Sequence, residues 1–330
     1  MRFRLGLLLA LATPVRMYAQ DNASPTYPPP GRLIDIGGRQ LHLDCSGQGA
    51  PTVVLVAGGN AFAIDWALVQ PKAAAATRVC SYDRAGLGWS DPGPAEETVE
   101  ETIDDLHRLL GSAGEKPPYI LVGASIGGIF IRAYQHAFPN EVAALVFANS
   151  SHRVGMQVKG GGDLIWNLSE DQLRSAFPLP ASSKGPAPTH EGEPFDRLPP
   201  DLQAIRLWLD LRLWKKWDPA TAGPEAVLSW RKEFLREFAE MAVGQNPPLR
   251  DLPVIVLSSD ERPSDPNRRL DRTDAGAALD LLSSNTLYIT ATGSGHEIHL
   301  YQPDLVARAL VRAVVAGRNR VPLSPAPDRP

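Results

Sequence analysis

The sequence predicts an α/β fold, in which helices flank a mostly parallel central sheet. Short, continuously apolar segments such as 52–56 and 144–148 recur along the chain, and such runs are typical of strands buried on both faces. Helical segments such as 98–110, with apolar residues on one face, alternate with them. Between one apolar run and one helical run, residues 123–127 read Gly-Ala-Ser-Ile-Gly. This alternation indicates a parallel sheet, with a sharp turn where that strand meets its helix.

The elements of this fold can be placed in order along the chain. Residues 32–44 alternate apolar and polar side chains around two glycines, which predicts a hairpin of two strands. Later strands are expected at 52–56, 78–82, 118–122, 144–148, 253–257 and 285–289. Helices are expected at 98–110, 129–138 and 303–316. Residues 318–330, which carry prolines and arginines, are expected to form a disordered tail.

The alternation of strands and helices stops between residues 152 and 250. Glycines at 160–162 and a proline-rich stretch at 178–200 predict loops. Helices are expected around them, at 164–177, 201–217 and 224–243. Three tryptophans of the second helix are spaced by six and three residues, which does not fit one narrow stripe: Trp208, Trp214 and Trp217. These side chains either belong to an ordinary core, or at least one of them lines an apolar pocket.

Composition limits the possible functions. The chain has 330 residues, of which 43% are hydrophobic and 21% charged, and its formal net charge is −4. This balance suits one or two globular domains with a sizeable core. The pI near 6.0 and the lack of a basic stripe argue against a nucleic-acid partner. The sequence contains no recognisable metal-ligand cluster and no phosphate-binding glycine loop, so neither a metal nor a cofactor is expected.

The N-terminal 20 residues have the features of a short secretory signal. Arg2 and Arg4 precede an apolar run of eight residues at 5–12, which is too short to span a bilayer. Ala19 suits a cleavage site, although Met17 is not the small residue expected two positions earlier. The alternative is an apolar N-terminus with no export function. We therefore expect a secreted or periplasmic protein, with a proline-containing linker at 21–31.

Ser125, at the centre of the Gly-x-Ser-x-Gly sequence, is the candidate nucleophile. A tight turn between a strand and a helix makes a serine hydroxyl stand clear of the backbone. Gly123 and Gly127 have no Cβ, so the strand and the helix can approach closely around that turn. N–H groups at the start of the helix also face any negative charge that develops there.

Seven histidines compete for the role of the general base. His296 stands in Gly-Ser-Gly-His-Glu, after the last predicted strand and before the last helix, where flanking glycines allow a loop to carry an imidazole over the sheet edge. His152 follows a strand end and is an alternative, whereas His299 is expected to turn away. The remaining four are interpreted as surface or core residues: His42, His107, His136 and His190.

The acid that would complete a triad has several candidates. Asp260, Glu261 and Asp265 follow the strand at 253–257. Asp260 is preferred because it is nearest the strand end, and Asp265 is the alternative. The position after the preceding strand is Asn149, which cannot stabilise an imidazolium by charge.

These motifs resemble those of the α/β-hydrolase superfamily, and in particular its single-lid serine esterase-like branch. The resemblance rests on the order serine, acid, histidine and on segments that extend from about 32 to 316, apart from the insertion. They are 52–59, Tyr-Asp-Arg-Ala-Gly-Leu-Gly-Trp-Ser at 82–90, the serine turn, 145–151 and 293–303. It implies a core formed by 32–151 and 251–317, and a helical lid at 152–250 inserted after the sixth strand.

The resemblance also implies an activity. It is that of a serine hydrolase that cleaves a carboxylic ester, lactone or thioester of a small molecule, with an apolar acyl part, through an acyl-enzyme. The oxyanion would be held by the backbone N–H groups of Ile126 and Gly59. Ala124 and Ala57 replace histidines often found in these enzymes, which leaves the substrate class open. The alternatives are a lyase or perhydrolase of this fold, or a non-catalytic binding member. No stable membrane anchor is expected.

The chain contains two cysteines, Cys45 and Cys80. In the strand order that the resemblance implies, they lie on neighbouring strands and can meet the distances that a disulfide requires. An oxidising compartment would preserve such a bond, whereas a cytosolic protein would keep two reduced thiols. The disulfide and export are therefore linked expectations.

Overall fold

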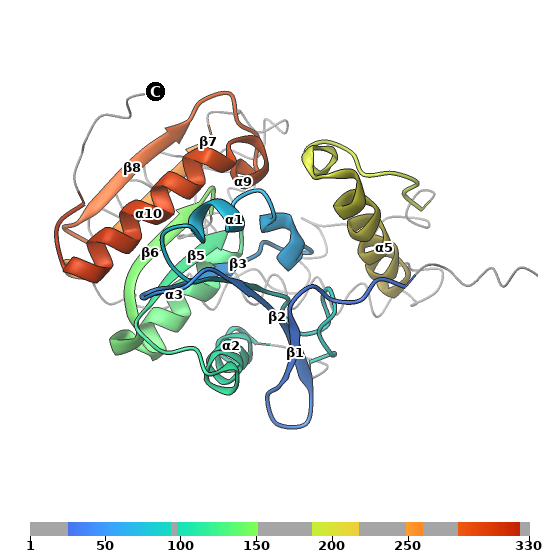
Figure 1. The fold of residues 1–330 in the computed structure, drawn as a ribbon, viewed down its shortest axis with the longest axis horizontal. Helices are drawn as coiled ribbons and strands as arrows, with labels where there is room; N and C mark the ends of the chain where they lie inside the picture. Colours follow the sequence, from blue (N-terminus) through green and yellow to red (C-terminus); the bar gives the residue numbers. More distant parts are fainter. Residues whose placement is uncertain (1–25, 94–97, 151–186, 218–248, 260–282, 324–330) are drawn as a thin grey trace, which may run out of the picture.

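The computed structural model describes residues 26–93, 98–150, 187–217, 249–259 and 283–323. It contains an eight-stranded sheet with the order β1-β2-β4-β3-β5-β6-β7-β8 (Figure 1). Pairs β1–β2 and β2–β4 are antiparallel and the other pairs are parallel. The strands are β1 (Arg32–Asp35), β2 (Gln40–Ser46), β3 (Thr52–Val56), β4 (Val79–Tyr82), β5 (Tyr119–Ala124), β6 (Val142–Ala148), β7 (Val254–Ser259) and β8 (Thr286–Ala291). The predicted mostly parallel α/β sheet is confirmed.

The sequence explains the strand positions. All residues of β3, β4 and β5 are buried, as expected for apolar runs covered on both faces. The hairpin predicted at 32–44 is formed by β1 and β2, and its turn places Gly37 and Gly38 at φ of 104° and 98°. Both turn N–H groups donate to the Asp35 carboxylate, at 2.8 and 3.0 Å.

The described helices are α1 (Gln70–Ala73), α2 (Val99–Ala113), α3 (Gly127–Ala137), α5 (Pro200–Trp217), α9 (Ile298–Tyr301) and α10 (Pro303–Asn319), with short 3₁₀ turns η1 (Ala63–Trp66), η2 (Pro139–Glu141) and η3 (Phe195–Arg197). Helices α2, α3, α5 and α10 lie close to their predicted positions, whereas the short helices α1 and α9 were not predicted. Thr98 and Glu101 form a capping box at the start of α2, and Gly114 ends it in the left-handed conformation. Residues 318–323 of the predicted disordered tail are ordered, because α10 continues to Asn319 and the Leu323 N–H donates to Asn285 Oδ1.

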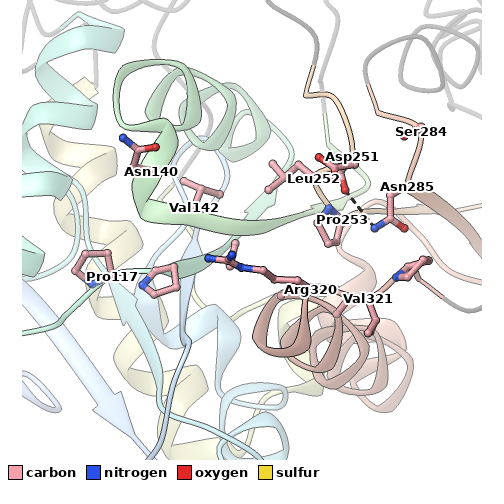
Figure 2. A pocket seen from close by; sticks show the side chains of 15 residues that line it. Pro117, Asn140, Val142, Asp251, Leu252, Pro253, Ser284, Asn285, Arg320 and Val321 are labelled. Carbon is pink, nitrogen blue, oxygen red and sulfur yellow. Dashed lines mark hydrogen bonds between the residues drawn. The ribbon is translucent and has the colours of Figure 1, made fainter.

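A cavity of about 600 Å³ lies at the amino ends of the parallel strands (Figure 2). Pro117, Val142 and Pro253 line it beside the start of β5, β6 and β7, and Arg320 reaches it from the end of α10. Ser125 follows the carboxyl end of β5. The cavity is therefore at the opposite edge of the sheet from the candidate nucleophile.

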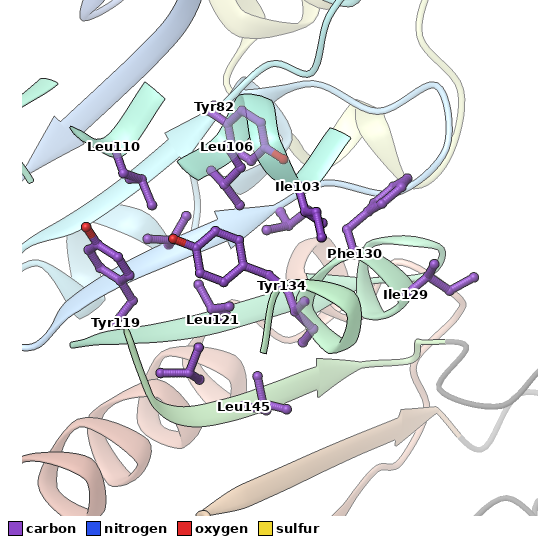
Figure 3. Close-up of a cluster of buried hydrophobic side chains, with 14 of the residues drawn as sticks. Tyr82, Ile103, Leu106, Leu110, Tyr119, Leu121, Ile129, Phe130, Tyr134 and Leu145 are labelled. Atoms are coloured by element: carbon purple, nitrogen blue, oxygen red, sulfur yellow. The ribbon is translucent and has the colours of Figure 1, made fainter. Parts of the chain in front are cut away.

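Each face of the sheet is covered by an apolar core. On one face α2 and α3 contribute Leu106, Leu110, Ile129 and Tyr134 to a cluster that includes Leu121 of β5 (Figure 3). On the other face, α1, η1 and α10 cover a second cluster that includes Trp66, Leu310 and Val314. This double cover fixes the carboxyl ends of β3, β5, β6 and β7, from which the candidate site is built.

Helix α5 lies within the segment predicted to form a lid, and it confirms the helix expected at 201–217. It lies apart from the sheet and beside the segment 61–66 (Figure 1). The helices expected at 164–177 and 224–243 lie outside the described residues. Among the helices that are described, none is long and apolar enough to cross a membrane.

Cys45 and Cys80 form a disulfide, as expected from their neighbouring strands. The two residues are register partners in the antiparallel pair β2–β4, with a Cα–Cα distance of 4.0 Å. Beside them, Glu115 accepts hydrogen bonds of 2.7–2.9 Å from the Arg78 guanidinium. This edge of the sheet is therefore held by one covalent bond and one two-pronged ion pair.

Candidate active site

Ser125 occupies the turn between β5 and α3, with φ of 50°. A non-glycine residue in the left-handed region is strained, and such strain often marks functional sites. A Cβ on Gly123 would lie 2.5 Å from the Gly127 carbonyl, and a Cβ on Gly127 would lie 2.5 Å from the Val56 carbonyl oxygen. Only glycine fits either position. The geometry is that of a nucleophile elbow, with Ser125 half-buried at the start of α3.

The loop after β3 lies directly against Ser125. A Cβ on Gly58 would be 3.2 Å from the Ser125 Cβ and 3.9 Å from its Oγ. The Arg84 guanidinium donates to the carbonyl oxygens of Ala57 and Gly58, at 2.7 and 2.8 Å. In a trans peptide the N–H points away from the preceding carbonyl. Arg84 therefore turns the Gly59 N–H to the opposite side of its peptide, and the loop is fixed beside the other predicted donor, Ile126, at the N-cap of α3.

His296 lies in the loop between β8 and α9, and its side chain is 53% exposed. The Nδ2 of Asn149 is 3.0 Å from His296 Nδ1 and donates to the His296 carbonyl oxygen at 3.1 Å. Asn149 follows β6 and is itself left-handed, with φ of 46°. The structure thus brings a side chain from the end of β6 to the loop that carries the predicted base.

The orientation of the Asn149 amide is fixed by its other partners. Its Oδ1 accepts from the Ser259 N–H at 3.2 Å, and its own N–H donates to the Leu257 carbonyl at 2.7 Å. With Oδ1 engaged by a donor, Nδ2 is the group that faces His296 Nδ1 and donates to it. Neutral His296 then carries its ring proton on Nε2.

The predicted acids Asp260 and Asp265 lie outside the described residues, as do Glu261 and the alternative base His152. Within the described residues, Asn149 is the side chain hydrogen-bonded to His296 Nδ1. It occupies the position that the sequence analysis set aside because an amide carries no charge. Although an amide carries no charge, it can hold the histidine loop by hydrogen bonds, as Asn149 does here.

A group of ionisable side chains lies beside His296. The Glu297 Oε1 is 4.0 Å from His296 Nε2, and its Oε2 is 3.7 Å from His299 Nε2. His299 is buried and stacks on Trp66, with ring centroids 4.4 Å apart. Burial, together with the positive charges of His296 and Arg206, lowers the pKa of His299 to about 3. His299 is therefore neutral and belongs to the packing against Trp66.

Helix α5 is attached to the core by Arg206. This arginine is 4% exposed and donates from Nε to Asp65 Oδ1 at 2.8 Å, and from Nη1 to Glu191 and Asp210 at 2.9 and 2.7 Å. Its guanidinium also lies over the Phe195 ring, 3.3 Å from the centroid. Burial raises the pKa of Asp65, and the charge of Arg206 opposes that increase. The sequence analysis did not identify this cluster, because its members are scattered along the chain.

Apolar contacts surround this ionic attachment. Leu209 of α5 is buried with Phe62 and Ile64 of the loop after β3. Trp208 lies edge-on to Tyr27, at 5.6 Å between centroids, and 6.2 Å from the Trp89 ring. Trp208 therefore belongs to the packing between helix α5 and the core, Trp214 is half-buried, and the side chain of Trp217 lies outside the described residues. Of the segment expected to be a linker, residues 26–31 form no helix or strand, but they contact this packing through Tyr27.

The other described histidines are structural or exposed, as predicted. His42 is fully buried, and its Nδ1 is 2.7 Å from Asp83 Oδ2. His107 stacks on Phe138 and pairs with Glu141, while His136 and His190 are exposed. Within the described ranges, the only metal-like group of ligand atoms comprises Cys45, Cys80 and Glu115. Its two sulfurs are joined in the disulfide, so they are not available as thiolate ligands.

The fold and the elbow define a chain of the α/β-hydrolase type. The chain belongs to the alpha/beta hydrolase family, whose model matches residues 53–309. It is similar to a serine hydrolase involved in carbazole degradation, at 17% identity and a TM-score of 0.56, over 86% of this chain and 98% of the other. It is also similar to a thermophilic esterase from Thermogutta terrifontis, at 20% identity and a TM-score of 0.55, over 82% and 92%. At these identities the two structures establish a shared fold.

Sequence relatives match a smaller part of the chain. A protein of Hormonema carpetanum described as a probable transporter (efuK) is 35% identical over 127 residues, which is 36% of this chain and 18% of that protein. The chain spans no more than 36% of the length of the first three curated relatives that it matches. These relatives therefore support the family and do not identify a substrate.

Proposed function

We propose that this protein is a serine hydrolase that cleaves a small carboxylic ester, lactone or thioester through an acyl-enzyme. The observation that carries the proposal is the conformation of Ser125, which is strained at a glycine-packed turn between β5 and α3. A serine in an ordinary loop has no reason to be held in the left-handed region. The similarity to a serine hydrolase and an esterase of the same fold agrees with this chemistry.

In the proposed reaction the Ser125 hydroxyl attacks the substrate carbonyl while His296 Nε2 accepts its proton. The oxyanion is held by the N–H groups of Ile126 and Gly59, and removing one such donor typically costs about 3–4 kcal/mol. The alcohol or thiol leaves with a proton from His296. A water activated by His296 then releases the acid and regenerates the serine.

His296 acts as a base at Nε2 only when its ring proton is on Nδ1. Nδ1 must then leave the Asn149 amide donor and meet an acceptor. We propose Asp260 for this role, with Asp265 as the alternative, because both follow β7 in the sequence.

The substrate is proposed to be a small molecule with an apolar acyl part, enclosed between the core and the lid. The support is the seating of α5 over the loop that carries the proposed oxyanion donor, with Phe62, Ile64 and Leu209 between them. Secretion or export to the periplasm is part of the same proposal and rests on the N-terminal signal-like residues.

A serine-reactive fluorophosphonate tests the nucleophile directly. The wild-type protein should be labelled with one probe per chain, and Ser125→Ala should abolish both labelling and ester hydrolysis, by several orders of magnitude in kcat/KM. Ser112→Ala, at an exposed serine near the end of α2, is the matched control and should change neither. Hydrolysis by Ser125→Ala within tenfold of wild type would contradict the proposal.

The same preparation separates the alternative functions. An ester, lactone and thioester panel graded by acyl length, with product analysis, distinguishes hydrolysis from lyase or perhydrolase chemistry on the same serine. A binding member of the fold would show neither labelling nor turnover. An active hydrolase would give labelling of Ser125 together with release of the free acid.

A further inference from the structure

Glu297 is the described carboxylate that lies beside the catalytic imidazole. Its Oε1 is 4.0 Å from His296 Nε2, the nitrogen that would accept the serine proton, and its side chain is 22% exposed. At this separation two unit charges attract appreciably in a partly buried setting. The carboxylate therefore faces the atom on which positive charge develops when Ser125 attacks.

The charged side chains around Glu297 come from several neighbouring elements of the fold. His299 is neutral, as its lowered pKa requires. From η1, Asp65 adds a second negative charge, and from α5, Arg206 supplies the buried positive charge. From η3, Arg197 lies over the Tyr301 ring of α9 and pairs with Glu193. From α10, Asp304 is exposed and pairs with Lys72, and β7 carries no titratable side chain.

This environment brings the pKa of the Glu297 carboxyl close to neutral pH. Burial, followed by the negative charge of Asp65, raises its pKa to about 7, and the positive charge of Arg206 opposes the increase. A carboxyl group with this pKa changes its charge near neutral pH, beside the predicted base.

We propose that Glu297 is a positioning residue for His296: its carboxylate, 4.0 Å from Nε2, stabilises the imidazolium. The proposal rests on the proposed function insofar as His296 is the base. Under this proposal the ionised carboxylate makes His296 easier to protonate.

The test measures the protonation of His296 without any substrate. In the Ser125→Ala background, the imidazole resonances of His296 are titrated by NMR with glutamate at 297 and with Glu297→Gln, which removes the charge and keeps the shape. The neutral side chain should lower the pKa of His296 by about half a pH unit or more. Asp304→Asn is the matched control, because it removes an exposed carboxylate from the neighbouring helix, and it should leave the pKa unchanged.

Glu297→Asp provides the rescue arm, since it keeps the charge on a shorter side chain. Glu297→Asp should reverse most of the decrease in the His296 pKa that Glu297→Gln causes. In the active protein, the acid limb of kcat/KM should move to lower pH with Glu297→Gln and return toward wild type with Glu297→Asp. An unchanged His296 pKa in Glu297→Gln, or equal shifts with Gln and Asp, would overturn the proposal. Loss of the proposed hydrolase function would appear separately, as absent fluorophosphonate labelling.

Discussion

Asn149 connects three segments that are far apart in the sequence. It stands at the end of β6, bonds to β7 through Leu257 and Ser259, and reaches His296, 147 residues away. Asparagine tolerates the left-handed backbone found here better than most residues. The residue therefore combines a local conformational preference with a side chain that fixes the histidine loop.

Replacing this amide by a carboxylate should raise the pKa of His296. In Asn149→Asp, an oxygen would face Nδ1 near the present 3.0 Å separation and would accept a proton from it. The acid limb of the kcat/KM profile should move to higher pH by about one unit or more. Asn140→Asp, an exposed change in η2, is the control. An acid limb that stays in place would show that Asn149 does not set the protonation of the base.

Ser125 and His296 could be proposed from the local sequence alone, because each lies in a turn whose glycines are adjacent in the chain. The contributions of Asn149 and Glu297 could not be predicted in this way. Asn149 reaches His296 only after β6 and β8 have taken their places in the sheet. The charge environment of Glu297 depends on Asp65 and Arg206, which are brought together by tertiary contacts.

At the scale of elements, the positions of the strands were predictable, but the side on which helix α5 packs against the core was not. A continuous apolar run such as β3 has few structural alternatives when both faces are covered. Helix α5, in contrast, has apolar residues around most of its circumference, and Leu207, Leu211 and Trp214 are half-buried on the side away from Leu209. Its apolar pattern alone therefore does not specify which side of the helix faces the core. That side is set by Arg206, which pairs with the buried Asp65.

Arg206→Met should loosen the lid helix. The change leaves Asp65, 1% exposed, without its positive partner, and removing one member of a buried ion pair typically costs about 3–5 kcal/mol. Amide hydrogen exchange across 200–215 should accelerate strongly. Arg212→Met on the same helix removes an exposed arginine that donates to the Gly88 carbonyl, and should have little effect. Equal exchange rates in the two variants would mean that apolar contacts alone hold α5.

At the scale of the whole molecule, the sheet order brings the segments of the candidate site to one edge of the sheet. β3 and β5 are neighbours, and β6, β7 and β8 follow on one side. Their carboxyl ends place the loop at 57–60, Ser125, Asn149 and the His296 loop at one edge, as expected for open parallel sheets. The other side of the sheet ends in the antiparallel strands β2 and β1, where no strand of the candidate site lies and where the disulfide is found.

The disulfide should stabilise the whole fold by restricting the unfolded chain. It closes a loop of 35 residues between β2 and β4, for which the chain-entropy relation gives roughly 3–4 kcal/mol. In urea unfolding, a reductant should lower the stability of the wild-type protein by about this amount and should not affect the double variant Cys45→Ala/Cys80→Ala, which also controls for direct effects of the reductant. A wild-type protein that is insensitive to reductant, or that shows two free thiols after unfolding without reduction, would contradict this expectation. Because such a bond persists in oxidising compartments, the thiol count on protein collected outside the cytosol also tests the proposed export.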